Sequence, residues 1–187
     1  IVCGDYNIVH KRIDIKNWNV ENLRDQIAVV PQDAFLFSDT IKNNIQFGKE
    51  DATQEEIEHF AKIADVHKNI MRFENGYETI LGERGITLSG GQKQRVSIAR
   101  ALIKDAPVLL LDDCLSAVDT ETEERILNNL KDISAKKTTI IVTHRVSSAK
   151  NADKIIILND GEIIEQGTHN QLLNQKGYYN NLYNKQL

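Results

Sequence analysis

Residues 86–95 read ITLSGGQKQR, a polar turn with two glycines that opens directly into a helix. Ser89 and Gln92 form an S-x-x-Q capping box, which satisfies two of the free donors at a helix start. Two glycines in a first turn cost roughly 1 kcal/mol each relative to alanine, and capping needs neither. Bare N–H groups at the positive end of a helix suit an anion, and missing side chains let a phosphate approach closely. A capped surface helix is the plainer alternative, but the glycines favour a phosphate-binding turn.

The helix that follows this turn has an apolar spacing. Val96, Ala99 and Ile103 recur at helical intervals, whereas Arg95 and Arg100 lie off that face. This pattern predicts a helix with one apolar side and one solvated side.

Composition limits the class of protein. The chain has 187 residues, of which 41% are apolar and 27% charged, as in an ordinary globular domain. Its net charge of -4 gives no general electrostatic case for nucleic acid or an anionic membrane surface. Cys3 and Cys114 are too few for a disulfide framework or a zinc site, which is typical of a reducing compartment. No apolar run approaches the roughly 18 residues that span a bilayer, so any membrane connection must come through a partner or a missing part of the chain.

Three apolar segments predict strands that end in polar residues. Ile27–Val30 is followed by Pro31 and Gln32, and the run PVLLLDD at 107–113 ends in Asp112 and Asp113. TTIIVTH at 138–144 ends in His144. Continuous apolar runs suit strands buried on both faces of a parallel sheet, and ligands bind at the carboxyl ends of such strands.

The two carboxylates at 112 and 113 have distinct predicted uses. Asp112 could hold Mg²⁺ through water, and Asp113 could orient or deprotonate a nucleophilic water. The alternative is that Asp113 caps the next turn.

Helix and turn signals complete the pattern. Thr53–Met71 is predicted to be helical and to form a small helical lobe, and residues 73–85 form a loop with the charged tip Glu83-Arg84. Thr120 and Glu123 predict a capping box for a further helix, as do Thr53 with Glu56 and Thr168 with Gln171. Residues 159–161, Asn-Asp-Gly, predict a hairpin, and Ile13 and Ile15 a short strand. Alternating strands and helices therefore predict an α/β nucleotide-handling domain.

The ordered motifs closely resemble the nucleotide-binding domain of ATP-binding cassette (ABC) transporters over essentially the whole chain. They are the signature LSGGQ, the strand ending in Asp-Asp, the D-loop SAVD, and the THR that holds the switch histidine, at residues 88–92, 108–113, 116–119 and 143–145. VPQ at 30–32 resembles the Q-loop, and TILGERG at 79–85 is similar to the X-loop of exporters. The resemblance implies one domain over 1–187 with a P-loop NTPase-like parallel-sheet core covered by helices. A small helical subdomain with the X-loop and signature would span about 50–105, and 106–187 would hold the Walker B strand, D-loop, switch histidine and C-terminal helices.

The resemblance also implies roles, with ATP and Mg²⁺ as cofactors and two cassettes sandwiching two ATP molecules. The signature turn would bind ATP held by the opposing domain, through Leu88, Ser89, Gly90, Gly91 and Gln92. Asp112 would support Mg²⁺, and Gln32 would sense metal and attacking water while contacting the membrane domain. Asp113 would be the catalytic base and His144 the switch residue. The D-loop residues Ser116 and Asp119 would lie at the cassette interface, and Glu83 and Arg84 would couple to the transmembrane domains.

Two departures from the family pattern qualify these roles. The phosphate loop G-x-x-x-x-G-K-[ST] does not occur in the 187 residues, so we expect an N-terminally truncated domain that alone binds ATP weakly or not at all. Asp113 stands where the family has glutamate, one methylene longer. This resembles the degenerate-site subunit of a heterodimeric exporter, whose intact signature serves the partner's site.

The expected function is thus that of an ABC exporter ATPase domain at the cytoplasmic face of the cell membrane, with no nucleic-acid partner. Its partners would be a second nucleotide-binding domain, in a different subunit, and transmembrane domains fused upstream. One alternative is the ATPase head of a chromosome-maintenance or repair protein, against which stand the absence of sustained heptads and of a basic stripe. A non-hydrolysing regulatory cassette is the second alternative.

Overall fold

The computed structural model describes residues 2–3, 20–82 and 88–186, which form two compact units. One unit comprises residues 25–139, and the other comprises residues 1–24 and 140–187. None of the helices in the described ranges is long and apolar enough to cross a bilayer.

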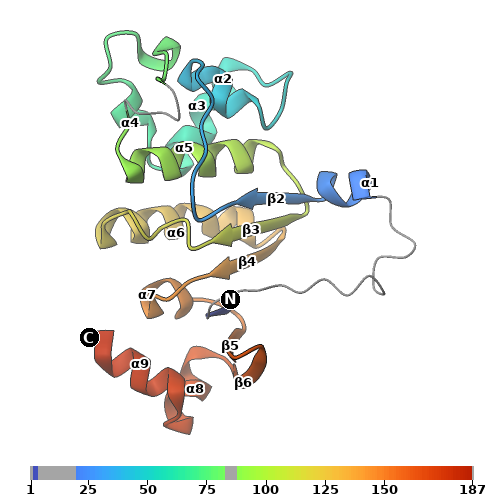
Figure 1. Cartoon of the computed structure of the whole chain (residues 1–187), viewed down its shortest axis with the longest axis vertical. Helices are drawn as coiled ribbons and strands as arrows, with labels where there is room; N and C mark the ends of the chain where they lie inside the picture. Colours follow the sequence, from blue (N-terminus) through green and yellow to red (C-terminus); the bar gives the residue numbers. More distant parts are fainter. Residues whose placement is uncertain (1, 4–19, 83–87, 187) are drawn as a thin grey trace. The chain divides into compact units, whose positions relative to one another are not determined.

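The larger unit contains a parallel strand pair. β2 (Ile27–Val30) pairs with β3 (Val108–Asp112), and the register places Ile27 opposite Val108 and Val30 opposite Leu111. Val30 and Leu111 are buried, as expected for strands covered by helices. Helix α5 (Gly90–Ile103) contacts β2, and α6 (Thr120–Ser134) follows β3 in the chain (Figure 1).

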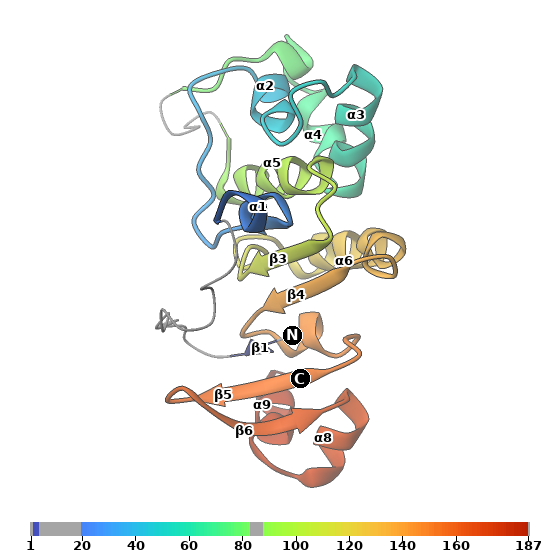
Figure 2. The ribbon, with the colours of Figure 1, turned by 90° about the vertical axis from the view of Figure 1, so that its right-hand side faces the viewer.

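A group of short helices lies beside α5 in the same unit (Figure 2). It consists of α2 (Ile41–Gln46), α3 (Gln54–Ile63), α4 (His67–Ile70) and the 3₁₀ turn η1 (Gly76–Glu78). α2 and α3 both contact α5 and supply the buried side chains of Ile41, Ile45, Ile57 and Ala61. α3 and α4 lie within the stretch that was predicted to be helical, Thr53–Met71.

The predicted helix over Thr53–Met71 is two helices. α3 ends in a Schellman motif, in which Val66 N donates to Ala61 O and Asp65 N donates to Lys62 O, at 2.9 Å and 3.0 Å. Asp65 takes the left-handed conformation there, with φ of 54°. An apolar periodicity that continues across the break hid this turn.

Helix α5 does not have the solvated side that its sequence predicted. Eight of its fourteen residues are buried, and they include the polar side chains of Gln94 and Ser97. Arg95 and Arg100 are partly buried and donate hydrogen bonds to other segments. The prediction failed because loops and helices far away in the sequence cover the arginine side of the helix.

The described residues of the smaller unit include three strands and the end of a fourth. β4 (Thr138–Val142) ends there and pairs in parallel with β1 (Val2–Cys3), which pairs in parallel with β5 (Ile155–Asn159). β5 and β6 (Glu162–Gly167) form the predicted antiparallel hairpin. Asp160 and Gly161 have φ of 50° and 81°, as a type I′ turn requires.

Helices of this unit complete a second core. They are α7 (Val146–Ala149), α8 (His169–Gln175) and α9 (Tyr178–Gln186), and α1 (Val20–Asp25) lies at the boundary of the units along the chain. Tyr179 is fully buried beside Leu172 and Ile155. The strand expected around Ile13 and Ile15 lies outside the described residues. Parallel strands and covering helices confirm the α/β class.

Candidate functional site

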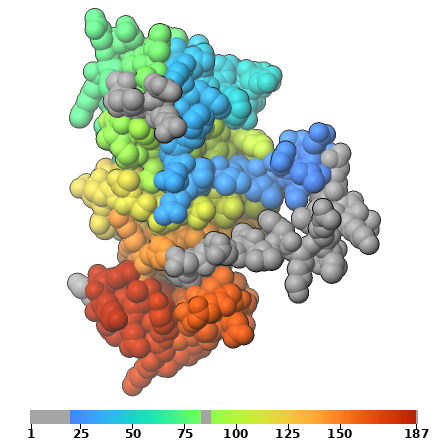
Figure 3. All heavy atoms as spheres, in the orientation of Figure 1, coloured from blue at the N-terminus to red at the C-terminus, as the bar shows by residue number. Residues whose placement is uncertain are grey.

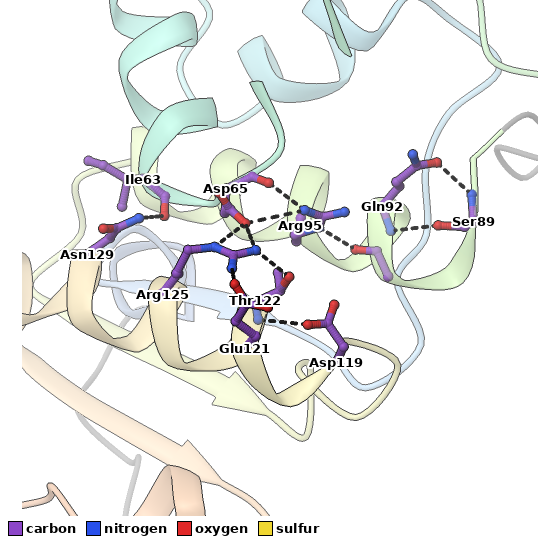
Figure 4. A network of polar contacts seen from close by, with 11 residues as sticks. Ile63, Asp65, Ser89, Gln92, Arg95, Asp119, Glu121, Thr122, Arg125 and Asn129 are labelled. Carbon is purple, nitrogen blue, oxygen red and sulfur yellow. Dashed lines mark hydrogen bonds and ion pairs between the residues drawn. The ribbon is translucent and has the colours of Figure 1, made fainter. Parts of the chain in front are cut away.

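The signature turn has the predicted cap. Ser89 Oγ accepts a hydrogen bond from Gln92 N at 3.3 Å, and Gln92 Oε1 accepts one from Ser89 N at 3.0 Å (Figure 4). Leu88 is buried, whereas Ser89 and Gly90 are exposed. The turn is therefore anchored by an apolar side chain and presents the N-terminus of a fourteen-residue helix to solvent.

Ala117 and Val118, in the loop 116–119, pack against the glycines of this turn. A Cβ atom on Gly91 would lie 2.8 Å from the carbonyl oxygen of Ala117, which is closer than real Cβ contacts allow. A Cβ atom on Gly90 would lie 3.6 Å from the Cβ of Ala117, which is ordinary contact. Gly91 is thus needed for packing against the loop, and Gly90 is not.

The two carboxylates lie at and just beyond the carboxyl end of β3. Asp112 is its last residue, and both Asp112 and Asp113 are partly buried. Asp113 has a left-handed backbone, with φ of 42°, and its carbonyl oxygen accepts hydrogen bonds from Ser116 N and Ser116 Oγ at 3.2 Å and 2.8 Å. Asp113 therefore begins a tight turn that leads into residues 116–119. In the same turn, burial raises the pKa of the Cys114 thiol to about 12.

Asp119 caps α6, which corrects the predicted Thr120–Glu123 capping box. Asp119 Oδ1 accepts a hydrogen bond from Thr122 N at 2.9 Å. This bond is the largest cause that holds the pKa of Asp119 below its usual value. The cap lies one residue earlier than predicted, because Asp119 has the extended backbone of an N-cap whereas Thr120 is already helical.

Gln32 lies two residues beyond the end of β2. Val30 pairs with Leu111, and Gln32 and Asp113 each lie two residues beyond this pair. Gln32 is exposed, and residues 31–40 run along the surface toward α2 (Figure 3). The parallel pair therefore delivers two predicted site residues to one end of the strands.

Gln94 joins two of these segments, and sequence reasoning missed it. Its side chain is 6% exposed. Gln94 Nε2 donates to Gln32 O at 3.4 Å, and Gln94 Oε1 accepts from Ala117 N at 3.2 Å. A glutamine two residues after a capping glutamine gave no periodic or motif signal of its own.

An ion-pair network connects α5 to the helical lobe and to α6 (Figure 4). Arg95 Nε donates to Gly91 O at 3.2 Å, and Arg95 Nη1 donates to Asp65 O. Arg125 donates from Nε and Nη2 to Asp65 Oδ2 at 3.2 Å and 3.1 Å, and from Nη1 to Glu121 Oε1 at 2.7 Å. Burial lowers the pKa of Arg95, and the charge of Asp65 opposes that shift. Asp65 can serve both arginines because it occupies the left-handed end of α3.

Arg100 anchors the segment that follows Gln32. Its Nε and Nη2 donate to the backbone and side-chain oxygens of Asn44 at 2.7 Å and 2.9 Å, and Nη1 donates to Phe35 O at 2.9 Å. The guanidinium also lies 5.4 Å from the ring centroid of Phe37 and 5.9 Å from that of Phe47. Burial lowers the pKa of Arg100 to about 10, so it remains charged at neutral pH.

The remaining predicted residues lie elsewhere. His144 follows β4 in the smaller unit, is exposed, and its carbonyl oxygen accepts a hydrogen bond from Gln186 Nε2 at 2.8 Å. Glu83 and Arg84 lie outside the described residues. The larger unit alone thus holds the turn 88–92, the two carboxylates, the loop 116–119 and Gln32.

Comparison with known proteins identifies the family of the chain. The family described as ABC transporter matches residues 2–116. The chain belongs to the ABC transporter family. It is 48% identical over 185 residues to the uncharacterized ABC transporter ATP-binding protein YknU of Bacillus subtilis, covering 99% of this chain and 31% of that protein. It is 49% identical over 174 residues to the multidrug resistance-like ATP-binding protein MdlA of Escherichia coli, covering 93% and 30%.

A solved structure gives the same result for this ABC domain. The structure of a bacterial Atm1-family ABC exporter with ATP bound matches with a TM-score of 0.84 and 43% sequence identity, over 89% of this chain and 29% of that one. The chain spans about a third of the length of these relatives. These matches confirm the predicted identity as an exporter-type ABC nucleotide-binding domain with a P-loop NTPase-like fold.

Proposed function

We propose that this domain forms half of an ATP-driven exporter motor, in which its signature turn completes the ATP site of a different subunit. The observation that carries the proposal is the exposed, capped turn at Ser89–Gln92, with residues 116–119 packed against Gly91. Ser89 Oγ uses a lone pair to cap the helix, which leaves its hydroxyl proton for a phosphate oxygen. Helix N–H groups and a hydroxyl donor suit the γ-phosphate of an ATP molecule that the partner holds.

The chain supplies only part of an ATP site of its own, because its sequence has no G-x-x-x-x-G-K-[ST] loop. The described residues include no cluster of three or more histidine, cysteine, aspartate or glutamate side chains that could hold a metal ion. Mg²⁺ in ATPases uses one or two carboxylates together with phosphate oxygens and water. Asp112, partly buried at the end of β3, fits as that carboxylate, and Gln32 is the second proposed ligand. When bound, Mg²⁺ would neutralise charge that develops on the phosphates.

Asp113 is proposed to make this subunit's own site slow. Aspartate is one methylene shorter than the glutamate of the family pattern, and a misplacement near 1 Å can cost on the order of 100-fold in rate. Asp113 would orient water poorly, His144 would contact the γ-phosphate, and Ser116 and Asp119 would face the opposing cassette. The backbone of Asp113 is left-handed, and aspartate adopts this conformation more readily than most residues. The conformation of the turn therefore favours aspartate at this position.

The transmembrane domains are proposed to contact the exposed aromatic surface that follows Gln32. Phe35, Phe37 and Phe47 are 54%, 37% and 66% exposed, and their rings contact one another in sequence. Exposed adjacent aromatic side chains are typical of a protein–protein interface. The matched relatives are about three times as long as this chain, which leaves room for such domains in proteins of this kind. Gln32, Glu83 and Arg84 would couple this domain to the transmembrane domains, at the cytoplasmic face of the membrane.

Asp113→Glu in the full-length transporter, co-expressed with its partner, tests the proposal. Hydrolysis at this subunit's own site should rise by an order of magnitude or more, because the longer side chain reaches the attacking water. Single-site turnover is isolated by inactivating the partner's Walker B glutamate. Ser89→Ala is the companion change, and it should lower hydrolysis at the partner's site only. Unchanged turnover in both experiments would contradict the assignment of the two sites.

A further inference from the structure

Gln94 is a buried polar side chain with two distant backbone partners. It is 6% exposed, in a helix whose neighbouring residues Val96, Ile98 and Ala99 are completely buried. An apolar side chain would satisfy such a position at lower cost, because a buried amide must find partners for both of its polar ends. The partners of Gln94 are therefore the reason to expect a role beyond packing.

These partners belong to two loops that the strands deliver. Gln94 Nε2 donates to the carbonyl oxygen of Gln32, after β2, at 3.4 Å. Gln94 Oε1 accepts from the N–H of Ala117, in the loop after β3, at 3.2 Å. Both backbone groups lie beyond the ladder of the β2–β3 pair, so the side chain replaces strand partners that they have lost.

The planar amide of Gln94 links the backbones of Gln32 and Ala117 rigidly. Nε2 and Oε1 are held at a fixed separation, and the stem of the side chain is packed in the core of α5. The same helix begins with Gly90 and Gly91, and Gly91 contacts Ala117 directly. A shift of the Gln32 backbone would therefore displace the backbone of Ala117 through the side chain of Gln94. The signature turn, at the start of the same helix, would stay in place.

We infer that Gln94 is a positioning residue that couples the two ATP sites of the proposed pair of cassettes. This inference rests on the proposed function, in which Gln32 serves this chain's own ATP and Ser89–Gln92 with residues 116–119 serve the ATP of the partner. Gln94 then joins the part that senses one nucleotide to the part that contacts the other. Its chemical role is to hold two backbone groups, and it does not touch either nucleotide.

The test is Gln94→Met in the full-length transporter with its partner, because methionine keeps the length of the side chain and removes both hydrogen bonds. We expect kcat to fall on the order of tenfold, with KM for ATP nearly unchanged and the Hill coefficient for ATP reduced toward 1. Gln94→Glu keeps the acceptor for Ala117 N–H but sets a second oxygen against Gln32 O, so it should not restore the lost activity. Ser97→Ala is the matched control, because Ser97 is equally buried on the same helix and should leave kcat within twofold.

A second measurement does not depend on hydrolysis. Hydrogen exchange at the amide of Ala117 should become roughly fivefold faster in Gln94→Met, and only slightly faster in Ser97→Ala. An unchanged exchange rate at Ala117, or wild-type cooperativity in Gln94→Met, would overturn the coupling while the proposed function stands. If instead a pair that carries Ser89→Ala, with Gln94 unchanged, hydrolyses ATP at the wild-type rate, the proposed function fails and the coupling fails with it.

Discussion

Replacing each glycine of the signature turn by alanine separates packing from helix propensity. Gly90 and Gly91 occupy the first two positions of α5, so alanine should stabilise the helix by about 1 kcal/mol at either one. At Gly90 the new methyl group would lie 3.6 Å from Ala117 Cβ, and nothing must move. At Gly91 it would lie 2.8 Å from Ala117 O, so that the carbonyl must shift by about 0.5 Å to restore normal contact.

The expected difference follows from this overlap. Forcing a methyl group into a packed site costs about 1–3 kcal/mol, and the propensity gain cancels between the two variants. With about 2 kcal/mol between them, and about 2–4 °C per kcal/mol for a domain of this size, Gly91→Ala should unfold roughly 4–8 °C below Gly90→Ala. Calorimetry of the two variants at one scan rate, in the same full-length protein, measures this difference.

Three outcomes are informative for the reasoning on these glycines. Equal unfolding midpoints would refute the argument that the loop 116–119 needs a bare Cα at Gly91. If both variants lose hydrolysis at the partner's site although only Gly91→Ala is destabilised, the methyl at Gly90 must act on phosphate approach and not on folding. Wild-type activity in Gly90→Ala would count against the phosphate role of that glycine.

Two further predictions concern polar anchors of the same unit. Arg100→Ala should lower the free energy of unfolding by about 3 kcal/mol, because three hydrogen bonds from a partly buried guanidinium are lost, and Arg100→Lys should recover only part of that loss. Urea denaturation measures both variants, and a loss under about 1 kcal/mol in Arg100→Ala would contradict the anchor. The pKa of Asp119 is lowered in the folded chain, so its cap stabilises the protein above the pKa of the unfolded state and is lost as pH falls through the folded value. Asp119→Asn keeps a capping side chain but should flatten the dependence of stability on pH below the ordinary aspartate pKa of about 4, and an unaltered profile would refute the cap as its source.

Much of the fold could be predicted from local sequence signals. The capping boxes at Ser89, Thr53 and Thr168 and the turn at Asp160-Gly161 were confirmed, because each is decided within a few residues. The strands at Ile27–Val30 and Val108–Asp112 also agree with the sequence, since continuous apolar runs have few other uses. The order of these caps and strands along the chain agreed with the order of the family motifs.

The errors have two physical origins: competing local turn signals, and tertiary contacts that override the local pattern. The break at Asp65 lies inside an apolar periodicity, and the Asp119 cap competed with an equally plausible box one residue later. Arg100 was expected in solvent but is held by Phe35 and Asn44, and Gln94 bonds to a residue 62 positions earlier. No window of local sequence contains both members of such a pair.

These long-range contacts change how the signature helix should be understood. Its first turn was predicted to be a phosphate-binding element, and its remaining residues an ordinary amphipathic support. In the structure, Gln94, Arg95 and Arg100 point from one helix to the Gln32 loop, the end of α3 and the aromatic segment after Gln32. A rigid helix that is bonded to all of these segments cannot move at its N-terminus without displacing them. The position of Ser89 is therefore set by contacts made along almost two turns of α5, from Gln94 to Arg100, and a substitution far from the turn can alter what the turn binds.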